Sequence, residues 1–88
     1  MTIEQTLKDR GEAYGSFEDF SRLSQSIKRE MTKGKWWVHT SPSQREAFEM
    51  IAHKIARLLN GGAHHADSWH DIAGYALLIE KELNHVSD

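Results

Sequence analysis

The sequence predicts an all-α fold, a small helical bundle of three main helices plus a short N-terminal helix. Apolar residues recur at spacings of three and four, helix-start residues precede each such stretch, and Gly or Ser/Pro positions separate four segments. With 88 residues the chain is expected to form one domain, 1–88, with a small core. We therefore expect oligomerisation, as a homodimer, to complete the bundle.

The first segment is expected to be a short helix from Thr2 to about Arg10. Thr2 and Gln5 have the spacing of a capping box, in which each side chain satisfies a free backbone N–H group of the other. Gly11 is expected to stop this helix. A helix this short is marginal alone, so we expect it to dock on the body of the domain or on a partner.

The second helix is predicted to start after Ser16, with Ser16 as N-cap and Asp19 at the third helical position. It is expected to end at Gly34. Its apolar residues should form one buried face: Phe17, Phe20, Leu23, Ile27 and Met31.

The connector that follows contains two adjacent tryptophans, Trp36 and Trp37, which is unusual for a loop. One interpretation is a lid over the end of the bundle; the other is an aromatic surface for a partner protein or for stacking on bases. Large aromatic side chains are mostly buried, which favours the lid.

The third helix has the clearest start in the chain. Ser41 can cap it, Pro42 suits its first position and Gln44 completes a capping box. The run 60–62 (Asn-Gly-Gly) predicts a left-handed termination. The expected apolar stripe is Phe48, Ile51, Ala52, Ile55, Leu58 and Leu59.

The last helix is predicted to begin near Asp67, which would act as its N-cap. Its apolar face is unusually wide, because Leu77 and Leu78 flank the main stripe. A face of this width indicates burial on more than one side, and hence close packing or oligomer contact. The main stripe is Trp69, Ile72, Ala73, Ala76, Ile79 and Leu83.

Composition narrows the class of protein. A formal net charge of −2 gives no global positive field for nucleic acid or anionic lipid, and the absence of cysteine excludes disulfides and thiolate metal sites. No apolar run is long enough for a membrane span, and the residues after Met1 lack the basic-then-apolar pattern of a signal peptide. We expect a cytoplasmic protein without membrane contact.

Polar residues concentrate between His64 and Asp71, at the start of the last helix. Asp67 and Asp71 are four residues apart and share a helix face. If the last two helices pack antiparallel across a short loop, Lys54 and Arg57 should lie near this acidic pair.

These residues suit a nucleotide site. Asp67 and Asp71, with Glu49 as a further candidate, would hold Mg²⁺, which prefers oxygen ligands, while Lys54 and Arg57 would hold phosphate oxygens. A histidine-based transition-metal site is less favoured, because no two histidines show a helical H-x-x-x-H spacing. The structural alternative is that Asp67 caps the helix and Asp71 pairs with Lys54 or Arg57.

Two alternatives need no catalysis. A non-enzymatic module could bind another protein, or inhibit a protein complex, through Trp36 and Trp37. Nucleic-acid binding is less favoured, although a local basic run lies beside the tryptophans, comprising Lys28, Arg29, Lys33 and Lys35.

The segment 54–58 (KIARL) together with 67–75 (DSWHDIAGY) resembles DUF6378, a family of phage and prophage proteins of unknown function. The general pattern is also similar to MazG-like all-helical nucleotide pyrophosphohydrolases, which bind Mg²⁺ through acidic E-E-x-x-E and E-x-x-D helices. Asp71 matches the final aspartate, whereas Ser68 stands where those enzymes have glutamate, and Glu46 and Glu49 supply only E-x-x-E. The resemblance implies a phage or prophage accessory protein in the host cytoplasm that binds or hydrolyses nucleotides or, as the alternative, binds or inhibits a host or phage protein complex without catalysis.

Overall fold

The structure, a computed structural model, describes residues 2–87 of the chain. This part forms four α-helices, one 3-10 helix and no strand, which confirms the all-α prediction. The elements in order are α1 (Ile3–Tyr14), α2 (Phe17–Met31), η1 (Trp37–His39), α3 (Pro42–Asn60) and α4 (Ala66–Ser87).

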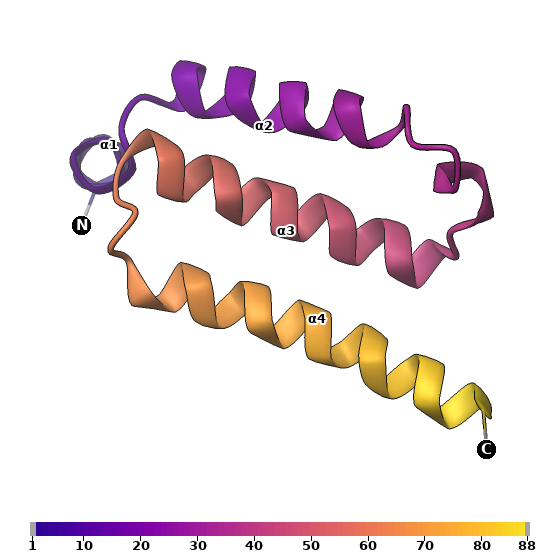
Figure 1. Cartoon of the computed structure of the whole chain (residues 1–88). Coiled ribbons are helices and arrows are strands. Elements are labelled where there is room, and N and C mark those ends of the chain that lie inside the picture. Colours follow the sequence, from indigo (N-terminus) through magenta and orange to yellow (C-terminus); the bar gives the residue numbers. More distant parts are fainter. Residues whose placement is uncertain (1, 88) are drawn as a thin grey trace.

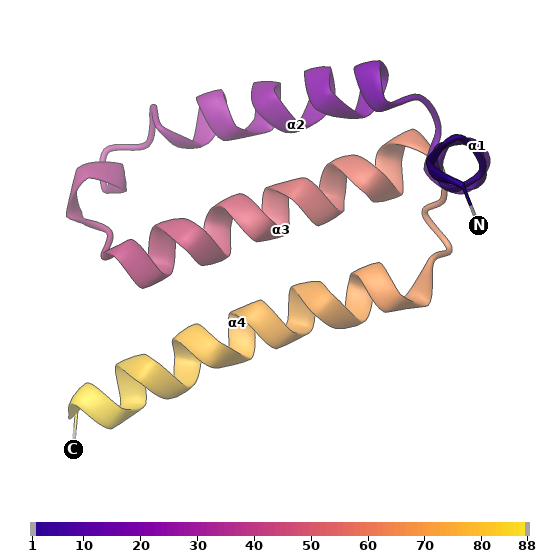
Figure 2. The ribbon, with the colours of Figure 1, turned by 180° about the vertical axis from the view of Figure 1, so that it is seen from behind.

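The three long helices lie side by side in a single layer (Figures 1 and 2). The middle position belongs to α3, which packs against α2 on one side and α4 on the other. The short helix α1 crosses one end of the layer and contacts both α2 and α3. Consecutive long helices run antiparallel (Figure 1), and residues 32–41 and 61–65 connect them.

Three predicted helix starts are confirmed. Thr2, Ser16 and Ser41 each accept a hydrogen bond from the backbone N–H three residues later, at 3.1 Å. At α3 the Gln44 side chain also accepts from the Ser41 N–H at 2.8 Å, so the capping box is complete. At α1 the Gln5 amide instead donates to Asp9. The capped ends fix where α1, α2 and α3 begin.

The predicted end of α1 at Gly11 is wrong. The helix continues through Gly11 to Tyr14, and the chain turns at Gly15, whose φ is 79°. Glycine in a helix interior costs only about 1 kcal/mol relative to alanine, which docking of α1 on α2 and α3 can offset. The helix therefore ends just before Gly15, the position where the backbone needs a positive φ.

Other predicted boundaries also shift. The second helix ends at Met31, before Gly34. Gly61 has φ −141°, so α3 does not end in a left-handed residue; its N–H donates to the Arg57 carbonyl and closes the last turn. Asp67 is not the N-cap of α4, because the helix begins at Ala66 and Asp67 lies within its first turn.

The core is made of small side chains. Among the described residues no large side chain is fully buried, and the buried apolar positions are Ala47, Ala52, Ala56 and Leu58 of α3. The predicted buried face of α2 is half-buried, and Phe17 is exposed. Of the predicted stripe of α3, Ala52 and Leu58 are buried, whereas Phe48 and Leu59 are exposed. The layer has no second layer above it.

The surface area and the radius of gyration also reflect the open, single-layer arrangement of the helices. Its accessible surface is 6792 Å², whereas a compact monomer of 10.1 kDa exposes about 5,300 Å². The radius of gyration is 15.3 Å, against about 12 Å for a compact chain of this length. A single layer of helices, with extents of 49 × 26 × 23 Å, explains both differences.

Candidate functional site

The structure joins the polar residues of α3 and α4 in an ion pair. Lys54 Nζ lies 3.0 Å from Asp71 Oδ2. The Lys54 side chain is only 14% exposed, so this pair satisfies a largely buried ammonium group. The hydrogen bond from Lys54, and further the charges of Lys54, His70 and Arg57, hold the pKa of Asp71 below its usual value. The predicted proximity of the basic and acidic residues is thus confirmed for Lys54 and Asp71.

The remaining candidate metal ligands lie apart from this pair. Asp67 is exposed in the first turn of α4. Glu49 precedes Lys54 by five residues, which turns it about 140° away around α3 and toward α2. Within residues 2–87 no group of three histidine, cysteine, aspartate or glutamate side chains could hold a metal ion. The described part of one chain therefore does not bring three such side chains together around Asp71.

Residues of the polar cluster also shape the turn before α4. His65 Nδ1 lies 3.2 Å from Ser68 Oγ, and Ser68 is buried. The Trp69 indole N–H donates to the Ala63 carbonyl at 2.8 Å. These contacts hold the α3–α4 connection in place, which is a structural role that the sequence did not indicate.

The two adjacent tryptophans have different surroundings. Trp37 is half-buried, with its ring 6.1 Å from Phe48 and the Arg45 guanidinium 5.5 Å from its centroid. Trp36 is 77% exposed and contacts His39 at 5.1 Å between ring centroids. Trp37 therefore covers the end of the bundle, while Trp36 is accessible from solvent.

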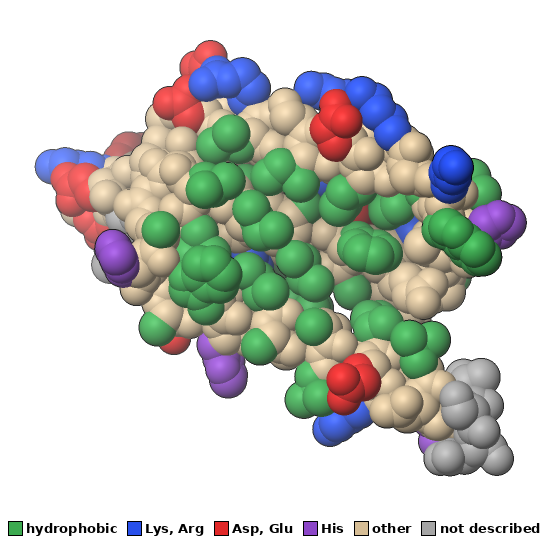
Figure 3. All heavy atoms as spheres, in the orientation of Figure 1, with side chains coloured by type: hydrophobic (Ala, Val, Ile, Leu, Met, Phe, Trp, Pro, Cys, Tyr) green, Lys and Arg blue, Asp and Glu red, His purple; other side chains and the backbone are tan. Residues whose placement is uncertain are grey.

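The layer has two unlike faces. Seven- and eleven-residue spacings place Phe48, Ile55 and Leu59 on one side of α3, whereas His53 and Arg57 lie on the opposite side. Figure 3 shows hydrophobic side chains gathered across α2, α3 and α4 on one face. We call this the apolar face, and we assign Trp69, Ala76 and Leu83 of α4 to it because their seven-residue spacing puts them on one side of that helix.

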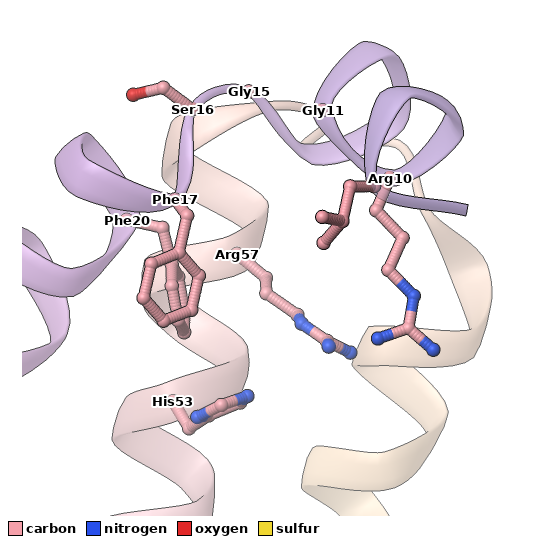
Figure 4. A pocket seen from close by; sticks show the side chains of 9 residues that line it. Arg10, Gly11, Gly15, Ser16, Phe17, Phe20, His53 and Arg57 are labelled. Carbon is pink, nitrogen blue, oxygen red and sulfur yellow. The ribbon is translucent and has the colours of Figure 1, made fainter. Parts of the chain in front are cut away.

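The opposite side is hollowed where α1 crosses the layer (Figure 4). This hollow, here called the α1 cavity, has a volume of about 250 Å³. Arg10 comes from α1, while His53 and Arg57 come from α3, and all three point toward the hollow. The other lining residues are Leu7, Gly11, Gly15, Ser16, Phe17 and Phe20.

The α1–α2 turn fixes the position of α1 above this cavity. The Asn60 side-chain amide donates to the Ser16 carbonyl at 2.9 Å, which ties the turn to the end of α3. A Cβ atom at Gly15 would lie 2.6 Å from Asn60 Nδ2, so glycine is required there for contact as well as for its backbone angles. Arg10 consequently lies across from Arg57.

His53 lines the cavity beside the aromatic ring of Phe20. Its ring meets Phe20 edge-on at 4.8 Å between centroids. Burial lowers its pKa first, followed by the positive charges of Arg57, Lys28 and Lys54.

Arg10, His53 and Phe20 were missed as site residues by the sequence analysis. The usable signal was the four-residue spacing of His53 and Arg57, because it puts both on one side of a helix. The position of α1, which brings Arg10, follows from no local pattern.

No helix in residues 2–87 has the length and apolar character needed to cross a membrane.

Comparison with known proteins gives a family but no activity. No curated protein and no solved structure matches the chain. The model of one family, described as a domain of unknown function, DUF6378, matches residues 2–83. Since this match covers nearly the whole of the helical layer and the α1 cavity, the chain belongs to the DUF6378 family.

Proposed function

We propose that this protein is a non-enzymatic binding module that works as a homodimer, with the apolar face of one copy covering that of the other. The observation that carries the proposal is the lack of any second layer over the apolar face. Exposed large hydrophobic residues on it include Phe48, Leu59, Trp69 and Leu83. Contiguous apolar surface of this kind is typical of protein association sites.

The exposed area supports a second copy as the occupant. The chain exposes about 1,500 Å² more than a compact monomer of its mass. A stable interface needs about 800 Å² from each partner, and obligate homodimers bury about 2,000 Å² or more in total. Two copies that each bury the excess fall within the obligate class, and their layers together form a core of six long helices.

The test is the mass in solution of matched variants, measured by light scattering after size-exclusion chromatography. Leu59 on the apolar face is 67% exposed, so Leu59→Glu leaves the monomer's own packing largely intact. We expect about twice the 10.1 kDa chain mass for the wild type and a single chain mass for Leu59→Glu, because a dimer interface would bury the new charge.

Leu78→Glu is the control. Leu78 is 63% exposed and lies seven residues after Asp71, on the side of α4 that faces Arg57 and away from Leu59. Leu78→Glu should remain dimeric. A monomeric wild type, or equal behaviour of the two variants, would contradict the proposal. A mass that rises only when a different protein is added would assign the face to that partner.

A second candidate function, nucleotide binding or MazG-like pyrophosphohydrolysis, is favoured by the approach of Lys54 to Asp71 beside Arg57. On this proposal Lys54 and Arg57 bind phosphate, and Asp67 and Asp71 face Mg²⁺ with ligands contributed by a second subunit. A phage or prophage origin, and action in the host cytoplasm, belong to the same proposal and rest on the sequence resemblance.

Thermal unfolding with nucleoside triphosphates and Mg²⁺ tests the nucleotide proposal, because a ligand that binds the folded state raises the melting temperature. Pyrophosphate release measures hydrolysis. An unchanged melting temperature together with no release would exclude this function and leave the binding module.

A further inference from the structure

We propose that the α1 cavity binds a small organic phosphate monoester, with the phosphate between Arg10 and Arg57 and an apolar, ring-containing body against Phe17 and Phe20. This site shares Arg57 with the candidate nucleotide site, but it includes neither the Lys54–Asp71 pair nor the apolar face. It is built from three segments of one chain, so it does not depend on the dimer proposed above.

The charge of the cavity fits a dianion. Two guanidinium groups converge on it from different helices, as Figure 4 shows for Arg10 and Arg57. Guanidinium groups form paired, charge-assisted hydrogen bonds with phosphate oxygens. The net charge of the whole chain is −2, so this local concentration of positive charge does not follow from overall composition.

Positive side chains also surround His53, whose pKa is lowered by burial first and then by their charges. Arg57, Lys28 and Lys54 all act on its ring in the same sense. A bound anion would offset the repulsion among these cations, which gives the cavity a reason to prefer a negatively charged ligand.

The walls of the cavity select for more than inorganic phosphate. Phe17 and Phe20 lie 5.9 Å apart between ring centroids, and Phe17 is 80% exposed despite its size. A flat apolar group placed against these rings would remove apolar surface from water. The volume of about 250 Å³ suits a compact ligand and is below the range typical of drug-sized molecules.

The cavity is held open by the backbone itself. Gly15 and the Asn60–Ser16 hydrogen bond set the angle at which α1 leaves the layer, and this angle keeps Arg10 across from Arg57. Such preorganisation lowers the entropy lost when a ligand binds.

Calorimetric titration of the full-length protein with phenyl phosphate tests the proposal, with inorganic phosphate and phenol as comparison probes. We expect phenyl phosphate to bind more tightly than either. Arg10→Gln should weaken it about tenfold or more, since a charge-assisted hydrogen bond to the phosphate is lost. The matched control is Lys8→Gln, which removes the same charge from α1 at a position outside the cavity lining and should bind as the wild type does.

Nuclear magnetic resonance of the histidine ring protons gives an independent readout, because phenyl phosphate should shift the His53 signal more than those of the surface histidines. Equal weakening by Arg10→Gln and Lys8→Gln would reduce the effect to general electrostatics and overturn the site. Phenol binding as tightly as phenyl phosphate would remove the role of the arginines. Inorganic phosphate binding as tightly as phenyl phosphate would remove the role of the phenylalanines.

Discussion

Replacement of Gly15 by alanine tests how the chain holds α1 in place. Gly15 has φ 79° and ψ −170°, a region that is essentially restricted to glycine and costs other residues about 1–3 kcal/mol. The new Cβ would also lie 2.6 Å from Asn60 Nδ2 and 2.7 Å from the Asn60 carbonyl oxygen. Relief of that overlap breaks the Asn60–Ser16 hydrogen bond, which contributes about 1 kcal/mol. We expect Gly15→Ala to lower the free energy of unfolding by about 3 kcal/mol.

Thermal unfolding followed by circular dichroism is the assay. For a domain of this size a loss of about 3 kcal/mol lowers the melting temperature by about 12–24 °C. Gly11→Ala is the matched control on the same helix, because a Cβ there meets nothing within 4 Å. It should raise stability by about 0.5–1 kcal/mol, as alanine does in helix interiors. If Gly15→Ala unfolds within about 0.5 kcal/mol of the wild type, the assigned backbone angles and contacts are wrong.

Three further predictions concern the α3 cap and two titrating groups. Ser41→Ala should cost about 1 kcal/mol in urea unfolding because the capping box is lost, whereas Ser43→Ala should change little; equal losses would contradict the assigned cap. The pKa of Asp71 is lowered from 3.8 by Lys54, so its contribution to stability is present above pH 3.8 and lost as the pH falls through the folded-state pKa; Asp71→Asn should abolish this acid-dependent part of the unfolding curve. The pKa of His53 is lowered from 6.5 by burial, so the free energy of unfolding should decrease as the pH falls from 6.5 to the folded-state pKa. A His53→Gln variant that keeps the full decrease would refute this assignment.

Local structure was largely predictable because it depends on neighbouring residues. The caps at Ser16 and Ser41 follow from side chains that reach a backbone N–H three positions away, and the structure contains both bonds. The pairing of Lys54 with Asp71 was predictable as well, since a short loop requires the two helices to run antiparallel. The predicted helix end at Gly11 was wrong because one glycine inside a helix costs little free energy compared with what docking of the helix on α2 and α3 contributes.

The candidate sites show where local patterns stop being sufficient. Helical spacing gives the apolar side of α3 and the opposite side with His53 and Arg57, but not the depth at which either is buried. Arg10 belongs to the α1 cavity only because Gly15 turns the chain and Asn60 fixes the turn. Trp36 and Trp37 are adjacent in sequence, yet only Trp37 meets Phe48 and Arg45.

The sequence by itself determined the helices, most of their starts and the antiparallel order of the long ones, because caps, periodicity and short loops act over a few residues. Only the tertiary structure decided that the helices form one layer with an uncovered apolar face and that α1 closes a cationic cavity on the other side. The physical reason is that both features depend on how far residues distant in the chain approach one another. The same apolar stripe on α3 is compatible with a closed bundle or an open layer, and packing between helices selects the layer.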